Sequence, residues 1–72
     1  MTPITTIEDL GRIVRTERKA QGLTQTDLAD ACNVGVSFIV NLEHGKKTTE
    51  VGKCLHVLQM LGIDLFSQKR GE

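Results

Sequence analysis

Apolar residues recur along the first third of the chain at intervals of three and four, the spacing that places side chains on one face of an α-helix. The first run comprises Leu10, Ile13 and Val14. Thr6 and Asp9 precede it at the spacing of a capping box, in which each side chain accepts a backbone N–H of the other residue. Gly22 suits the left-handed backbone conformation that often ends a helix. The pattern predicts a helix over residues 7–21.

Two short helices and a tight turn are expected next. The same capping signature, a Thr followed three residues later by an Asp, recurs at residues 24–27 and predicts a second helix over residues 25–31. The segment 32–35 carries Asn and Gly, the residue types that best tolerate a positive φ, and it predicts a turn. A third helix is expected over residues 36–44, and Gly45 ends it.

Apolar residues at helical spacing return after a polar and basic loop. The recurring positions are Val51, Leu55, Leu58 and Leu61. With Gly62 as the terminating residue, they predict a fourth helix over residues 50–61. Gly52 in its first turn lowers helix propensity by about 1 kcal/mol relative to Ala. We interpret this glycine as a mark of close packing.

Residues 63–67 alternate only imperfectly between apolar and polar side chains, and they are too few for another amphipathic helix. They predict a short β-strand. A lone strand leaves its backbone N–H and C=O groups unpaired, and the only other extended candidate is the segment 3–5. The simplest partner is the same strand of a second subunit, with Ile63, Leu65 and Phe66 in the dimer contact.

Length and composition indicate one folded domain. The chain has 72 residues, of which 39% are hydrophobic and 25% charged, as in folded soluble proteins and unlike disordered ones. We expect a single domain over residues 1–72 with its core over about residues 7–62. No apolar run approaches the ~20 residues of a membrane span, and the N-terminus lacks the basic start and apolar stretch of a signal peptide. These features predict a cytoplasmic protein without membrane contact.

Charge and reactive side chains exclude several classes of function. Nine basic and nine acidic residues cancel, which argues against indiscriminate polyanion binding but allows a localised basic face. The cysteines and histidines are not at metal-ligand spacing, so we expect no metal site, and we expect Cys32 and Cys54 to be buried apolar residues. The chain has no cluster of nucleophile, base and stabiliser and no phosphate cradle. We therefore expect neither enzyme activity nor a cofactor.

Two short helices joined by a Gly/Asn turn are typical of the helix-turn-helix motif, whose second helix enters the major groove of DNA. The stretches are Gly22-Leu23-Thr24-Gln25-x-x-Leu28-Ala29 and Ile39-x-x-Leu42-Glu43-x-Gly45-Lys46. Read together, they resemble the lambda-repressor-like (Cro/cI type) family over about residues 9–62, which implies a small all-α domain of four helices. The pairs Phe38-Ile39 and Leu61-Gly62 with the closing strand are similar to the HipB-type branch.

The resemblance implies roles for several residues. In the family, the position of Gln25 contacts a phosphate, and the positions of Val36, Ser37 and Asn41 face bases. The family pair at Arg18 and Glu43 forms a salt bridge that ties the first helix to the end of the third. The chain departs from the family at Gly35, where a Ser or Thr commonly caps the third helix, and at Asn33, where Gly is usual.

Side-chain chemistry agrees in part with these roles. Asn41 can form a bidentate pair with adenine, and Val36 or Val40 can pack on a thymine methyl group. Lys46 and Lys47 immediately follow the third helix, where they can neutralise phosphates. The alternative is that all the polar members are ordinary solvated side chains, and Phe38 is expected in the core. Three further basic residues on the first helix fit a DNA-facing and a solvated surface equally well: Arg12, Arg15 and Lys19.

These observations predict a homodimeric repressor that binds a palindromic operator in double-stranded DNA. The HipB-type resemblance implies the autoregulating antitoxin of a HipBA-like operon, with a HipA-like kinase toxin as a partner. The competing hypothesis is a protein-interaction module that holds a toxin or another protein and binds DNA weakly or not at all. The neutral net charge and the apolar third helix favour that second reading slightly.

Overall fold

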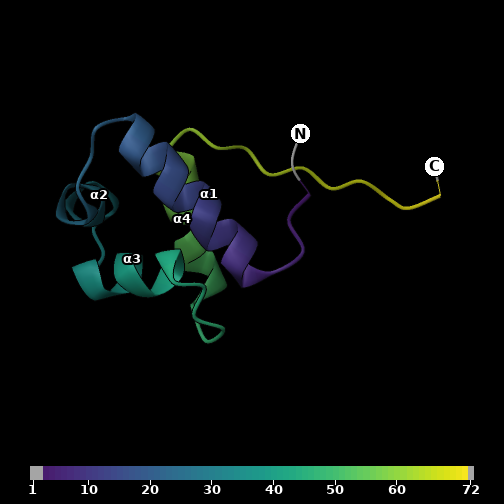
Figure 1. Ribbon diagram of the computed structural model, residues 1–72, viewed down its shortest axis with the longest axis horizontal. Helices are drawn as coiled ribbons and strands as arrows, with labels where there is room; N and C mark the ends of the chain where they lie inside the picture. The colour runs from purple at the N-terminus through teal and green to yellow at the C-terminus, as the bar shows by residue number, and fades with distance from the viewer. Residues whose placement is uncertain (1–2, 72) are drawn as a thin grey trace.

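The computed structural model describes residues 3–71 and contains four helices. They are α1 (Ile7–Ala20), α2 (Gln25–Cys32), α3 (Val36–Glu43) and α4 (Val51–Met60). α3 contacts both α1 and α2, and α2 also contacts α4. Figure 1 shows α2 and α3 next to one another at one end of the molecule, and the C-terminal segment leaves the end of α4 and runs out toward the opposite side. The predicted all-α domain of four helices is confirmed, and each helix begins and ends within a residue of its predicted bounds.

Both predicted capping boxes are present. The backbone N–H of Asp9 donates to Thr6 Oγ1 at 3.0 Å, and the backbone N–H of Thr6 donates to the Asp9 carboxylate at 3.2 Å. At the start of α2, Asp27 and Thr24 make the equivalent bonds at 3.0 and 2.9 Å. Hydrogen bonds from the Thr24 backbone and side chain lower the pKa of Asp27. These short-range contacts satisfy N–H groups that a helix start otherwise leaves unpaired.

The core lies where the four helices meet. Its fully buried large side chains are Val14, Leu28, Ile39, Leu42, Val57 and Leu58. Cys32 and Cys54 are also buried as free thiols, and burial raises the pKa of each. They therefore serve as small apolar core residues, as predicted. No helix among the described residues has the length and apolar character needed to cross a membrane.

Two glycines let α1 approach the end of α3 closely. A Cβ atom on buried Gly11 would lie 2.3 Å from the carbonyl oxygen of Leu42 and 2.9 Å from that of Glu43. Gly45, with a φ of 72°, packs against Glu8, whose Cα would lie 2.8 Å from an added Cβ. The Leu42 carbonyl beside Gly11 and the Glu8 Cα beside Gly45 are both backbone atoms of another element, so neither can move aside cheaply. The position of α3 on α1 therefore depends on glycine at both sites.

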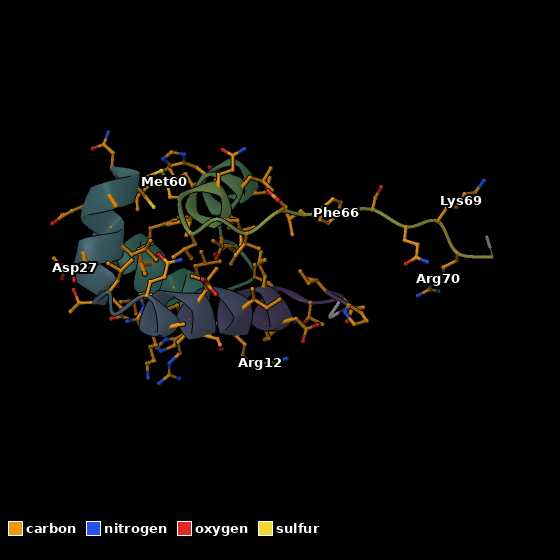
Figure 2. All side chains as sticks on the ribbon, turned by 90° about the horizontal axis from the view of Figure 1, so that it is seen from above. Arg12, Asp27, Met60, Phe66, Lys69 and Arg70 are labelled. Carbon is orange, nitrogen blue, oxygen red and sulfur yellow. The ribbon has the colours of Figure 1, made fainter. Side chains whose placement is uncertain are left out.

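The C-terminal segment differs from its prediction. Gly62, with a φ of 78°, ends α4, and the Ile63 N–H donates to Leu58 O at 2.9 Å. Residues 63–67 form no strand; Ile63 still packs on the core, and the segment then runs outward from the helices (Figures 1 and 2). Extended backbone becomes a strand only when it bonds to a partner, and none lies alongside within the described chain. The pairing of Ile63, Leu65 and Phe66 with a second subunit stays a prediction.

Candidate nucleic-acid interface

The turn between α2 and α3 depends on one left-handed residue. Asn33 ends α2 with φ and ψ of 56° and 46°, and the following Val34 N–H donates to Ala29 O at 3.0 Å. Asn tolerates this conformation better than most residues with a Cβ. Gly35 then begins α3 in extended conformation and provides no side-chain cap. The departure from a Ser or Thr cap thus leaves the first N–H groups of α3 without a side-chain acceptor.

The predicted base-contacting residues lie away from the buried side of α3. Ile39, Leu42 and Glu43 are buried, whereas Val36 is 46% exposed and Ser37 is exposed. Val40 and Asn41 are half-buried. The four side chains therefore border an accessible helix surface of mixed apolar and polar character: Val36, Ser37, Val40 and Asn41. Phe38 packs half-buried against the core, as expected.

Arg18 and Glu43 meet in a buried ion pair that links α1 to the end of α3. Arg18 Nε lies 2.6 Å from Glu43 Oε2, and Arg18 Nη2 donates to Oε1 at 3.0 Å. Their side chains are only 9% and 2% exposed. The remaining nitrogen, Nη1, donates to Leu23 O at 2.8 Å, so the guanidinium also holds the chain just before α2. This bidentate arrangement fixes α3 relative to α1.

The Glu43 carboxylate has a third donor, Gln25. Gln25 Nε2 lies 3.2 Å from Glu43 Oε1. Burial desolvates the carboxylate and by itself raises its pKa, but hydrogen bonds from Arg18 and Gln25 outweigh that effect, and the pKa of Glu43 is lowered. Gln25 is half-buried at the first position of α2. Its amide has a second N–H that remains available to a ligand at this surface.

Exposed basic residues lie in the loop that follows α3 and on α1. The Lys46 N–H donates to Asn41 O at 3.0 Å, which holds the start of the basic loop against the last turn of α3. Lys46 and Lys47 are both exposed. On α1, Arg12 forms an ion pair with Asp9 and points away from the helix (Figure 2), so it is already partly neutralised. Among the described residues neither loop lysine forms an ion pair of this kind.

The structure reveals two features near α4 that sequence reasoning missed. Glu50 caps α4, accepting the N–H groups of Gly52 and Lys53 at 2.7 and 2.8 Å. These bonds lower the pKa of Glu50. Gly52 is exposed, and the atom nearest to an added Cβ is Glu50 Oε1 at 2.8 Å, the flexible end of the capping side chain. Lys53 also lies over the ring of Phe38, 5.8 Å from its centroid, in a cation–π contact.

An apolar surface extends from α4 onto the C-terminal segment. It contains exposed large side chains, of which Phe66 is 81% exposed (Figure 2). An open groove here is lined mainly by Leu55, Leu58, Ile63, Leu65 and Phe66. A contiguous exposed patch of this kind marks an interaction site in many proteins. Among residues 3–71 no three His, Cys, Asp or Glu side chains gather as metal ligands.

Known proteins are similar to this chain along nearly all of its length. The "Helix-turn-helix" family model matches residues 14–66. An uncharacterized HTH-type transcriptional regulator, y4mF, of Sinorhizobium fredii (strain NBRC 101917 / NGR234) is 48% identical over 69 residues, which cover 96% of this chain and 91% of that protein. Similar solved structures include a HipB–O4 20mer complex and a HipA–HipB–O2–O3 complex, with TM-scores of 0.87 and 0.88. Both are 21% identical and cover 97% of this chain and 99% of theirs, so they establish the fold.

Proposed function

The chain belongs to the helix-turn-helix family of DNA-binding transcriptional regulators, and from that premise we propose that it is a homodimeric repressor of a palindromic operator. The observation that carries this proposal is that α3 is held on one side and accessible on the other. Its inner side is held by the core and by the Arg18–Glu43 pair, while Ser37 and Asn41 stand on its accessible side beside two exposed lysines. A rigid helix with an accessible polar side next to cations fits a DNA major groove. The protein acts by binding and without catalysis.

Base recognition is assigned to the accessible side of α3. Asn41 can pair bidentately with adenine in the major groove, because its side-chain N–H donates to adenine N7 and its Oδ1 accepts from adenine N6–H, and Ser37 either donates or accepts. Val36 and Val40 supply apolar surface for thymine methyl groups. Val36 is exposed and Val40 half-buried, and apolar side chains beside a polar contact would exclude water from it.

Phosphate contacts are assigned to Gln25, Lys46 and Lys47. The two lysines lie at one end of α3, and Gln25 lies at the start of α2 with its side chain oriented by Glu43. Because the Gln25 side chain reaches Glu43 at the C-terminal end of α3, these three residues would contact phosphates beside that end and fix the register on the duplex without reading sequence. Counterion release at the two lysines would let a chain with no net charge bind a polyanion.

The dimer contact is assigned to the apolar surface of α4 and the C-terminal segment. Leu55, Leu65 and Phe66 are 44%, 45% and 81% exposed in the single chain, and a second copy would cover them while pairing the extended backbone. A dimer places one α3 in each of two successive major grooves, about 34–36 Å apart. Phe66→Asp is expected to convert the dimer into a monomer in sedimentation equilibrium. A dimer of unchanged stability would place the contact elsewhere.

The narrower role we propose is that of the antitoxin in a HipBA-like operon, located in the cytoplasm with its operator. Support comes from the fold shared with HipB, which stands beside HipA in one of the similar structures. A HipA-like kinase is the expected partner. Co-expression tests this role: the protein should relieve growth arrest caused by such a kinase, and persistent arrest with both proteins folded would contradict it.

The test of DNA recognition is a fluorescence-anisotropy titration against promoter duplexes and scrambled controls at low and physiological salt. Asn41→Ala is expected to lose about 1–3 kcal/mol on the operator and little on scrambled DNA. Lys46→Ala should weaken all sequences alike and reduce the salt slope by about 2, because a dimer loses two phosphate contacts of about 0.9 each. Equal effects of the two changes on operator and scrambled DNA would refute base reading by α3.

A second candidate function is favoured by the exposed apolar surface around Phe66. A protein-interaction module would use this surface for a heterologous partner and would not need operator selectivity. The anisotropy titration separates the two functions, because such a module binds promoter and scrambled DNA equally weakly and loses both at physiological salt.

A further inference from the structure

A second open groove lies along α1, on a different side of the helix from its contact with α3. Gly11 and Arg18 of α1, which face α3, are buried, whereas the α1 residues of the groove are exposed or half-buried. The groove has a volume of about 400 Å³. It is lined by five residues of α1 and one of the C-terminal segment: Asp9, Arg12, Ile13, Thr16, Glu17 and Ile63. Ile63 also lines the groove beside α4, so the two grooves meet at this residue.

Glu17 gives the α1 groove a net negative charge. The other two charged residues of the groove, Asp9 and Arg12, form an ion pair with one another. Glu17 accepts a hydrogen bond from Gln21 Nε2 at 2.9 Å, and no cation of residues 3–71 pairs with it. The same nitrogen donates to Leu61 O at 2.8 Å, which holds Glu17 beside the end of α4. A half-buried carboxylate attracts a cation more strongly than a fully solvated one, because less water screens its charge.

The C-terminal segment carries two adjacent cations, Lys69 and Arg70, near its far end. Both are exposed. Figure 2 shows them beyond Phe66, away from the helices. A chain would therefore have to fold its segment back to bring either cation to its own Glu17.

Antiparallel pairing of two C-terminal segments would carry this basic end to the groove of the other copy. When the segment 63–67 lies opposite itself, residue 67 of one chain stands opposite residue 63 of its partner. The residues after 67 then run back past the partner's Ile63, which lines the groove. At about 3.3 Å per residue, Arg70 reaches about 10 Å beyond that point, toward the end of α4. Successive side chains of extended backbone point to opposite sides, so one of the two cations faces the groove in any such register.

We propose that the basic end of the C-terminal segment, Lys69 and Arg70, docks in the α1 groove of the partner copy and pairs with its Glu17. The proposal rests on the homodimer proposed above and adds a second contact to it. Each dimer contains two such pairs, related by the twofold axis. Because the Arg18–Glu43 pair links α1 to α3, the crossed segments also fix the spacing of the two α3 helices.

The experiment exchanges the charges of the two surfaces and measures dimer dissociation by sedimentation equilibrium at low salt, without DNA. The segment variant is Lys69→Glu/Arg70→Glu, and the groove variant is Glu17→Lys. Losing two exposed ion pairs raises the dissociation constant roughly 2- to 30-fold. Each variant alone should show at least this increase, because like charges then face one another.

Mixing the two variants shows whether the segment crosses between copies. Neither homodimer has an attractive pair, but a heterodimer has one at both grooves, so the mixture should associate about as tightly as wild type. A segment that docked on its own chain would give no gain on mixing, and this result would overturn the inference. The difference between each variant and wild type should also disappear near 1 M salt, where the screening length falls to about 3 Å.

Asp30 provides the matched control, because it is an exposed carboxylate on α2 outside the groove. Adding Glu17→Lys to the segment variant should restore the dimer, whereas adding Asp30→Lys should leave it weak. Equal rescue by both changes would reveal a general charge effect and overturn the inference. Circular dichroism checks that each variant is folded.

The same assay separates this inference from the proposal on which it rests. If Phe66→Asp dissociates the dimer but the segment variant leaves it unchanged, the inference alone is overturned and the groove is left for another protein. A wild-type chain that stays monomeric at every concentration would overturn the proposed homodimer together with it.

Discussion

Replacing Glu43 with Gln tests whether the buried ion pair holds α1 and α3 together. The substitution keeps the shape of the side chain but leaves the Arg18 guanidinium charged in a site where it is 9% exposed. Two Arg18 bonds and one Gln25 bond reach the carboxylate in the native protein. The neutral amide can accept some of these bonds but cannot balance the charge. The expected result is a strong loss of stability.

The magnitude follows from the degree of burial. Removing one partner of a buried ion pair costs about 3–5 kcal/mol, mainly through the unpaired charge that remains. We expect about 3 kcal/mol for Glu43→Gln, because Arg18 keeps its bond to Leu23 O. The free energy of unfolding of a native protein is about 5–15 kcal/mol, so this loss would be a large fraction of the total stability. The paired variant Arg18→Met/Glu43→Leu should recover much of it, since an apolar pair of similar volume leaves no charge behind.

The assay is urea unfolding followed by circular dichroism at a fixed protein concentration, because dimerisation makes apparent stability depend on concentration. Wild type, Glu43→Gln and the paired variant are compared at neutral pH. If Glu43→Gln lowered the free energy of unfolding by less than about 1 kcal/mol, the ion pair would be no stronger than an exposed surface pair, and the reasoning would be refuted. A paired variant as unstable as Glu43→Gln would also refute the reasoning, because the cost would then come from lost packing and not from the isolated charge.

Two further predictions concern the same framework. Gly11→Ala should destabilise the fold by about 1–3 kcal/mol or more and weaken operator binding, because its Cβ meets the Leu42 carbonyl at 2.3 Å; unchanged thermal stability would mean that α3 shifts freely on α1. Stability should also fall with acid. The carboxyl groups with lowered pKa values are those of Asp9, Asp27, Glu43 and Glu50. The unfolded chain binds protons at these groups more readily, so their stabilisation is complete above its ordinary carboxyl range near pH 4 and is lost as the pH falls through the lower native values. A urea midpoint that stays constant between pH 6 and pH 3 would contradict this sign.

Local signals explain why the helices could be predicted from the sequence. The capping boxes at Thr6 and Thr24 act over three residues, and each predicted helix lies within a residue of its observed bounds. Asn33 adopts the left-handed conformation that its residue type allows, with a φ of 56°. Contacts of this range are complete within one turn of chain, so neighbouring residues determine them.

The candidate site was predictable only where a residue pattern carried it. The accessible position of Ser37 and Asn41 follows from helical periodicity, and the meeting of Arg18 with Glu43 follows from the family resemblance alone. The Glu50 cap was obscured because glutamate is not a favoured N-cap residue.

The sequence by itself determined the number of helices, their ends and the side of each that is apolar, because these depend on spacing within a few residues. Only the tertiary structure decided how closely α1 approaches α3 at Gly11, which donors reach the Glu43 carboxylate and where Gly45 packs on Glu8. Those contacts join residues far apart in the chain, and their geometry depends on the packing of all four helices at once. Neither the sequence nor the fold of the single chain decides the structure of residues 63–67, since extended backbone there acquires a strand partner only through an assembly with another chain.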